Sequence, residues 1–259
     1  MLVAVLVTGF EAIALCGADN LFVPLGVCVI LSKITSKPLA EIVYQNLSLL
    51  GITGAVSLLA WRVRAFNTGG AIVLLLFVYG TWSLGSELWA APVVAALLLY
   101  LGAWLVFPGP PGGGIPVRVR LVFRAVLVPL LLLVTGNMLF CGDLLYVPFV
   151  GAVATALGIS LWNHVMERNP TMGNGRRAGL SALTGATAGL GVTAAAAWLS
   201  AIPRVDDGVP VVVLAAAATF ASDRVTGPNI TLPRVWGAAQ LGLAAVMAAA
   251  FVLLRVAGY

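Results

Sequence analysis

The sequence predicts an all-α protein of the polytopic membrane class, a bundle of about ten transmembrane helices. Hydrophobic residues make up 61% of the 259 residues and charged residues only 9%, whereas a soluble domain typically carries about 25% charged residues. The mean hydropathy is +1.07. None of the expected helices has the polar face that a helix in water needs, so lipid must be the solvent.

Ten apolar stretches come close to the roughly 20 residues with which a helix crosses the hydrocarbon core. They cover residues 2–15, 21–33, 39–61, 69–85, 88–107, 119–140, 144–162, 180–200, 209–222 and 236–256. The first, second and ninth are short, which suits re-entrant, tilted or interfacial segments. The clearest boundary is the stretch Pro108–Gly114, because proline and glycine cannot hold a helix there.

The distribution of Lys and Arg over alternate loops predicts the orientation. One side collects ten of the 14 basic residues, all of them arginines. They are Arg62, Arg64, Arg118, Arg120, Arg124, Arg168, Arg176, Arg177, Arg224 and Arg234. The positive-inside rule places these loops in the cytoplasm and the chain in the inner membrane as a multi-pass protein. The same bias accounts for the net charge of +5, so we expect no nucleic acid among the partners.

A first polar cluster interrupts the apolar sequence near the start of the chain. Glu11 lies two helical turns before Asp19, so the two acids share a face if the helix continues that far. A glycine and a proline bracket Asp19 and Asn20, which indicates a broken helix. Carboxylate and amide oxygens are ligands that suit Mg²⁺. The alternative is that Asp19 caps the helix that begins near Leu21.

A second block repeats the first. Cys141-Gly142-Asp143-Leu-Leu-Tyr-Val-Pro matches Cys16-Gly-Ala-Asp-Asn-Leu-Phe-Val-Pro with one residue deleted. The span count puts the two copies on opposite sides of the membrane, as an inverted repeat of five plus five helices would do. The match covers some nine residues, so chance is the alternative.

The segment Asn163–Arg177 is expected to be a long basic loop with Arg168, Arg176 and Arg177 around a glycine-rich turn. Guanidinium groups and free backbone N–H groups that converge on such a turn bind phosphate. The alternative is an ordinary cytoplasmic loop whose arginines only set the orientation.

Two further features lie near the end of the chain. The small residues of Thr184–Gly191 indicate a helix face that lets a neighbouring backbone approach closely. Asp223 follows Ser222 in a polar stretch of the Arg-rich side. Asp223 and the adjacent Arg224 are expected to neutralise each other at the interface.

Glu11-Ala12 followed by Gly17-Ala-Asp-Asn-Leu-Phe-Val-Pro-Leu25 resembles the closing segment of dolichol and phytol kinases. Those membrane enzymes use CTP to phosphorylate isoprenoid alcohols. The rest of the chain is similar to bacterial membrane proteins related to plant phytyl-phosphate kinase. The similar positions are Thr68–Ala71, Trp89, Pro92, Phe149–Ala152, Gly179–Ser181, Gly185, Gly189 and Ser222–Asp223. Where that family has Ala-Asp-Thr, this chain has Ala154-Thr155-Ala156.

The resemblance implies a kinase-tail helix pair at residues 1–38 joined to a transmembrane bundle at residues 39–259. It implies transfer of phosphate from CTP to an isoprenoid alcohol or its monophosphate, a reaction of lipid metabolism that mainly requires positioning and charge neutralisation. The residues assigned to catalysis are Glu11, Asp19, Asn20 and Asp223. The residues assigned to Mg²⁺ are Asp19, Asn20 and Asp223, and those assigned to phosphate are Arg168, Arg176 and Arg177.

The bilayer, the isoprenoid lipid and CTP are the expected partners. The nucleotide-binding body of such a kinase is expected on a partner protein or an upstream segment, and a second copy of the chain is a further expected partner. Two other functions stay open at this point, a transporter or permease-like protein and a catalytically inactive partner subunit.

Overall fold

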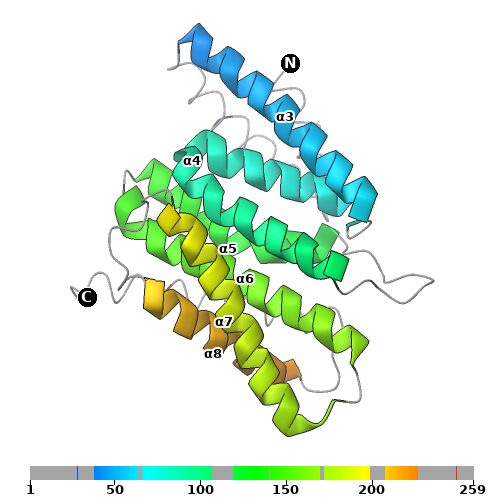
Figure 1. Ribbon diagram of the computed structural model, residues 1–259. Helices are drawn as coiled ribbons and strands as arrows, with labels where there is room; N and C mark the ends of the chain where they lie inside the picture. Colours follow the sequence, from blue (N-terminus) through cyan, green and yellow to red (C-terminus); the bar gives the residue numbers. More distant parts are fainter. Residues whose placement is uncertain are drawn as a thin grey trace.

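The computed structural model describes residues 38–63, 66–106, 119–139, 141–169, 172–198 and 208–226, together with positions 28 and 249. The described chain is built from α-helices (Figure 1), which confirms the prediction of an all-α protein for this part. The helices are α3 (Leu39–Val63), α4 (Thr68–Val106), α5 (Val119–Met138), α6 (Gly142–Arg168), α7 (Asn174–Trp198) and α8 (Gly208–Thr226).

Three of these helices are long and apolar enough to cross a membrane. They are Thr68–Val106, Gly142–Glu167 and Asn174–Trp198. Apolar helices of this length indicate a membrane protein, as the composition predicts. The total of about ten spans stays a prediction, because the stretches at 2–15, 21–33 and 236–256 lie almost wholly outside the described residues.

Helix α4 is a hairpin of two arms, residues 68–85 and 87–106. The backbone leaves the helical region at Ser86, with φ 77° and ψ −178°, a conformation in which residues other than glycine are strained. Phe66, just before the first arm, packs against Tyr100 near the end of the second, with ring centroids 5.5 Å apart. The two arms therefore run antiparallel (Figure 1), and the predicted boundary between stretches 69–85 and 88–107 is confirmed.

Helix α6 is the centre of the bundle. It contacts α4, α5, α7 and α8. Its side chains are buried along most of the helix, and Phe149, Val150, Ala154 and Ile159 have no exposed surface. Helix α3 lies at the edge and packs on α4 (Figure 1). A residue on α6 can thus take part in any site that the other helices form.

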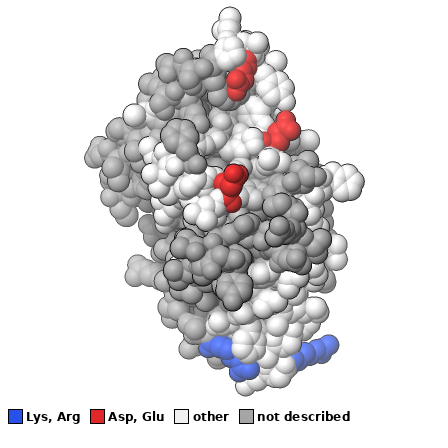
Figure 2. Space-filling model, turned by 90° about the vertical axis from the view of Figure 1, so that its left-hand side faces the viewer, with Lys and Arg blue, Asp and Glu red and all other residues white. Residues whose placement is uncertain are grey.

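Acidic side chains gather at one end of the bundle. Glu41 lies in the first turn of α3, Glu87 follows the break in α4, and Asp143 lies in the first turn of α6; all three are exposed. Helix α3 runs antiparallel to the first arm of α4, since Tyr44 lies 5.7 Å from Trp82 between ring centroids. Among the described residues on the face drawn in Figure 2, Asp and Glu lie over the upper part, and Lys and Arg lie at the lower edge.

The opposite end carries arginines and is called the arginine end below. It is formed by the ends of α6 and α8 and by the start of α7. Arg176 and Arg177 lie in the first turn of α7, and Arg224 lies in the last turn of α8. This end also carries Glu167, which is exposed. Arg176, Arg177 and Arg224, which the sequence analysis assigned to one side of the membrane, thus lie at the same end of the bundle.

The prediction of a long basic loop at Asn163–Arg177 is wrong. Helix α6 continues to Arg168 and α7 already begins at Asn174. The Asn163 side chain donates to the Ile159 carbonyl at 2.8 Å, so this polar residue fits within the helix. The backbone N–H of Arg177 donates to the Gly173 carbonyl at 3.0 Å. Arg176 and Arg177 therefore stand on a helical turn and not on a glycine-rich loop.

Candidate functional site

Glycines bring α6, α7 and α8 unusually close together next to the arginine end. A Cβ atom on Gly185 would lie 2.5 Å from the Ala215 carbonyl oxygen and 2.6 Å from Thr219 Oγ1. A Cβ atom on Gly158 would lie 2.6 Å from the same hydroxyl. Neither position has room for a side chain, which confirms the prediction that the small residues of α7 permit close backbone packing. This close contact, called the glycine seam below, is formed by Gly158, Gly185, Ala215 and Thr219. It fixes how the ends of the three helices face each other.

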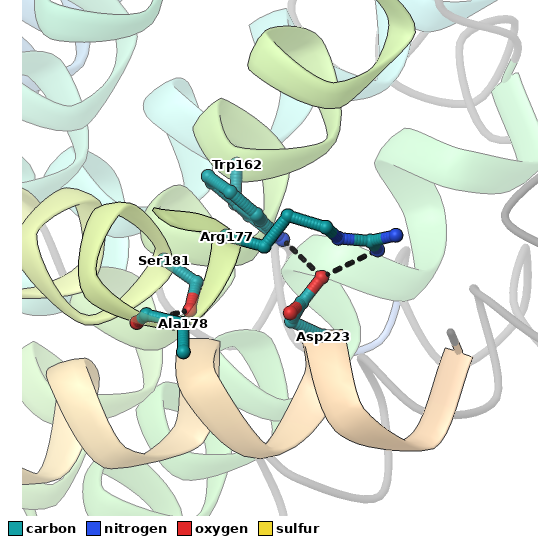
Figure 3. Close-up of polar contacts among 5 residues, drawn as sticks. All are labelled: Trp162, Arg177, Ala178, Ser181 and Asp223. Atoms are coloured by element: carbon teal, nitrogen blue, oxygen red, sulfur yellow. Dashed lines mark hydrogen bonds and ion pairs between the residues drawn. The ribbon is translucent and has the colours of Figure 1, made fainter. Parts of the chain in front are cut away.

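The site itself is an ion pair between Arg177 of α7 and Asp223 of α8 (Figure 3). The guanidinium Nη2 donates to Asp223 Oδ1 at 2.8 Å, although the residues are 46 positions apart in the sequence. Arg177 is 6% exposed and Asp223 is 5% exposed. Both predicted site residues are therefore inside the protein and in direct contact.

A third helix contributes Trp162. Its indole Nε1 donates to the same Oδ1 atom of Asp223 at 3.1 Å, and the ring is 1% exposed. Figure 3 shows the indole and the guanidinium approaching the carboxylate from different sides. Two donors from two helices hold the carboxylate in one orientation. Both bonds end on Oδ1.

Neither charge is placed where its own helix would favour it. Arg177 lies in the first turn of α7, next to the positive end of the helix dipole, and Asp223 lies in the last turn of α8, next to the negative end. Each helix alone therefore disfavours the charge that it carries. The partner charge offsets this only because the two helix ends meet.

Burial makes the pair costly in a second way. Removing two ions from solvent carries a desolvation cost that their attraction often does no more than offset. A well-packed apolar pair would hold α7 against α8 about as well. Ionisable groups buried in a membrane protein are functional-site candidates for this reason, and the cluster of Trp162, Arg177 and Asp223 is our candidate site.

The remaining site residues predicted from the sequence differ in outcome. Arg176 is exposed, one position before the buried Arg177. Arg168 is the last residue of α6, and its side chain lies outside the described part. Glu11, Asp19 and Asn20 also lie outside the described residues, so their approach to Asp223 stays a prediction.

The prediction that Asp223 neutralises Arg224 is wrong. Asp223 pairs with Arg177, whereas the Arg224 guanidinium lies 5.0 Å from the centroid of the Phe220 ring. Adjacent residues on a helix point in different directions, so Asp223 can face the bundle while Arg224 stays exposed. Sequence reasoning also missed Trp162, and the signal available was an indole, which needs a hydrogen-bond acceptor when it is buried.

Mg²⁺ is the cofactor expected from the sequence. Within the described ranges, no group of three or more His, Cys, Asp or Glu side chains is placed to hold a metal ion. Asp223 could supply one ligand through Oδ2, and Mg²⁺ usually needs only one or two protein carboxylates beside water and phosphate oxygens. Within the described residues, the site therefore offers a carboxylate that is held in place and paired with a guanidinium group.

No protein-family model, no curated protein and no solved structure matches this chain.

Proposed function

We propose that this chain is a multi-pass inner-membrane protein of about ten spans, with its arginine end in the cytoplasm. We further propose that it is a CTP-dependent, kinase-like transferase acting on an isoprenoid alcohol or its monophosphate. One observation carries the second proposal. Asp223, a predicted metal ligand, and Arg177, a predicted phosphate ligand, lie 2.8 Å apart although they come from different helices.

The geometry suits phosphoryl transfer because that reaction needs positioned charges more than covalent chemistry. Trp162 and Arg177 fix the carboxylate of Asp223 through Oδ1, and in the proposal Oδ2 binds the metal ion. The exposed Arg176 adds a guanidinium beside the site that a phosphate can reach. A lipid hydroxyl would enter from the bilayer and a nucleotide from the cytoplasm, and both would meet at this end.

Asp223 alone cannot hold Mg²⁺ tightly, since the ion takes six ligands in octahedral geometry. In the proposal, Asp19 and Asn20 supply further ligands and Glu11 completes the acidic group. A partner protein that carries the kinase half helps to bind the nucleotide. The alternative is that a second copy of this chain does so.

The test is phosphate transfer from labelled CTP to geranylgeraniol or phytyl phosphate by the purified protein with Mg²⁺. Removing the pair with Arg177→Met and Asp223→Leu together should retain the fold, because no buried charge is left unpaired. Activity should fall by about 100-fold or more, the order lost when one charge-stabilising group is removed. Arg224→Gln is the matched control, since Arg224 is exposed on the same helical turn, and it should stay within about twofold of wild type.

Asp19→Asn should also abolish transfer and leave membrane insertion intact, because asparagine keeps the shape and loses the charge that binds Mg²⁺. Full activity in the Arg177→Met/Asp223→Leu protein would contradict the proposal. So would the absence of CTP turnover by the wild type, alone and with its partner, over a panel of isoprenoid acceptors.

A catalytically inactive partner subunit is the second candidate. The observation that favours it is Thr155, which occupies the place where the similar family carries an aspartate. Thr155 is fully buried on α6, and among the described residues its hydroxyl has no hydrogen-bond partner. A metal site that needs a carboxylate there would be incomplete in this chain.

A further inference from the structure

A cavity of about 110 Å³ lies between α4, α5 and α6. Both arms of α4 line it, with Phe77 on the first and Val93 on the second. Val126 of α5 and Leu157 of α6 lie opposite. Among the described residues that line the cavity, only two have a polar side chain. The walls belong to the half of the bundle nearer the arginine end, because they include the first turns of α5 and the later turns of α6.

The size and the walls of the cavity favour a hydrocarbon group over water. An apolar cavity of about 150 Å³ stays dry and takes up benzene. A volume of 110 Å³ therefore suits a group of about five carbon atoms. A longer chain would place one such unit inside and continue beyond the cavity.

The polar side chains lie together at one end of the cavity. Ser160 donates to the Ala156 carbonyl at 2.7 Å, and both residues line the cavity. His164 follows one helical turn later on the same face of α6 and is 4% exposed. Its ring stacks on Trp104 with centroids 4.6 Å apart and lies 6.3 Å from the ring of Tyr100, which is the other polar lining residue.

A proline interrupts the backbone hydrogen bonding of α5 at the wall of the cavity. Pro129 lies inside α5 and has no N–H, so it cannot donate to the Ala125 carbonyl four residues earlier. Ala125 and Pro129 both line the cavity. Backbone carbonyls released by a proline in a membrane helix need another donor. A ligand with one hydroxyl group would provide it.

We propose that this cavity binds the hydroxyl-bearing end of a lipid alcohol. One branched unit of about five carbons fills the apolar part. The hydroxyl lies at the end lined by Tyr100 and Ser160, toward the arginines, and His164 lies behind the Tyr100 ring. The size and lining of the cavity indicate a ligand with an apolar group and a hydroxyl. The choice of an isoprenoid alcohol as that ligand rests on the proposed function.

The experiment is photolabelling of the purified full-length protein with a farnesol analogue that carries a diazirine on its first isoprene unit. CTP is absent, so binding is measured apart from catalysis. Adducts should map to the lining segments of α4, α5 and α6. Unlabelled farnesol should compete at about tenfold lower concentration than the hydrocarbon farnesane, because a hydroxyl that finds its partners adds about one hydrogen bond.

Ala96→Phe should abolish labelling of these segments, because Ala96 lines the cavity and the ring would fill it. Val94→Phe is the matched control, since Val94 is 39% exposed on the same arm and lies outside the lining. Ser160→Ala with Tyr100→Phe should bring farnesol and farnesane to nearly equal concentrations while labelling persists.

Adducts spread over the outer faces of the helices, with no loss in Ala96→Phe, would overturn the proposal. Competition by oleic acid but not by farnesol would overturn the choice of an alcohol. If Ala96→Phe fails to fold, the positions of the adducts in the wild type decide the question. Cavity labelling without phosphate transfer would contradict the proposed function and support binding of a lipid alcohol in the cavity. Phosphate transfer without cavity labelling would support the proposed function and contradict binding in the cavity.

Discussion

The side-chain amide of Asn137 on α5 donates a hydrogen bond to the backbone carbonyl of Leu84, where α4 breaks. The hydroxyl of Tyr146 on α6 donates to the Leu88 carbonyl on the other side of the break, at 3.1 Å. Carbonyls next to such a break lack the N–H donors of a continuous helix and need other partners. The turn at Ser86 is therefore stabilised by two other helices, and Asn137 has a structural role.

Asn137→Leu should lower the free energy of unfolding by about 1–3 kcal/mol, because it leaves the Leu84 carbonyl without this donor. Unfolding in mixed micelles of increasing SDS fraction measures the change. Asn46→Leu is the control, since the Asn46 amide donates to Ile42 in its own helix at 2.8 Å. Equal losses in the two variants would show that the amide at the break has no special role.

Gly185→Ala should destabilise the protein by about 1–3 kcal/mol, since the new methyl group meets backbone atoms of α8. Gly179→Ala on the same helix is the matched control, because a Cβ atom there meets nothing within 4 Å. That change should be neutral or stabilise by about 0.5–1 kcal/mol, as alanine restricts the unfolded chain. Thermal unfolding in detergent compares the two, and similar melting temperatures would contradict close packing at the glycine seam.

Asp223→Asn should cost about 3–5 kcal/mol of stability, because the buried Arg177 loses the carboxylate with which it forms an ion pair. Arg177→Met combined with Asp223→Leu should restore stability close to that of the wild type. A double-mutant cycle in detergent gives the coupling energy. Additive effects of the single substitutions would mean that the two side chains do not interact.

Cysteines placed at Gly173 and Asp143 should be accessible from opposite sides of the membrane, because Asp143 lies in the first turn of α6, Gly173 follows the end of that helix, and both residues are exposed. In a background without the three native cysteines, Asp143→Cys should react with an impermeant maleimide in intact cells. Gly173→Cys should react only after permeabilisation. Reaction of both from outside would contradict the proposed orientation.

The sequence predicts the helices well because apolar length depends on local composition. The break near Ser86 follows from Gly85-Ser86-Glu87, a polar interruption between two apolar stretches. Asn163 and His164 were misassigned to a loop because buried polar residues resemble loop residues in sequence. Their hydrogen bond and ring stacking, which only the fold shows, keep both inside the bundle.

The candidate site was predicted only in part. Asp223 was assigned to Mg²⁺ and Arg177 to phosphate, each from its own segment of the sequence. Their pairing depends on which faces of α7 and α8 meet, and that is set by Gly185 and Thr219. The donation by Trp162 depends in addition on the rotation of α6, which no local pattern specifies.

The placement of Arg177 on α7 and Asp223 on α8 has a consequence for biogenesis. A helix that enters the bilayer alone with one unpaired charge bears an insertion cost, which is about 2.5–3.5 kcal/mol at the helix centre and smaller at the helix ends, where these two residues lie. The two helices are consecutive in the chain, and their charges cancel only when they lie side by side. They are therefore expected to leave the translocation channel as a pair, so that partition into lipid and neutralisation occur in one step.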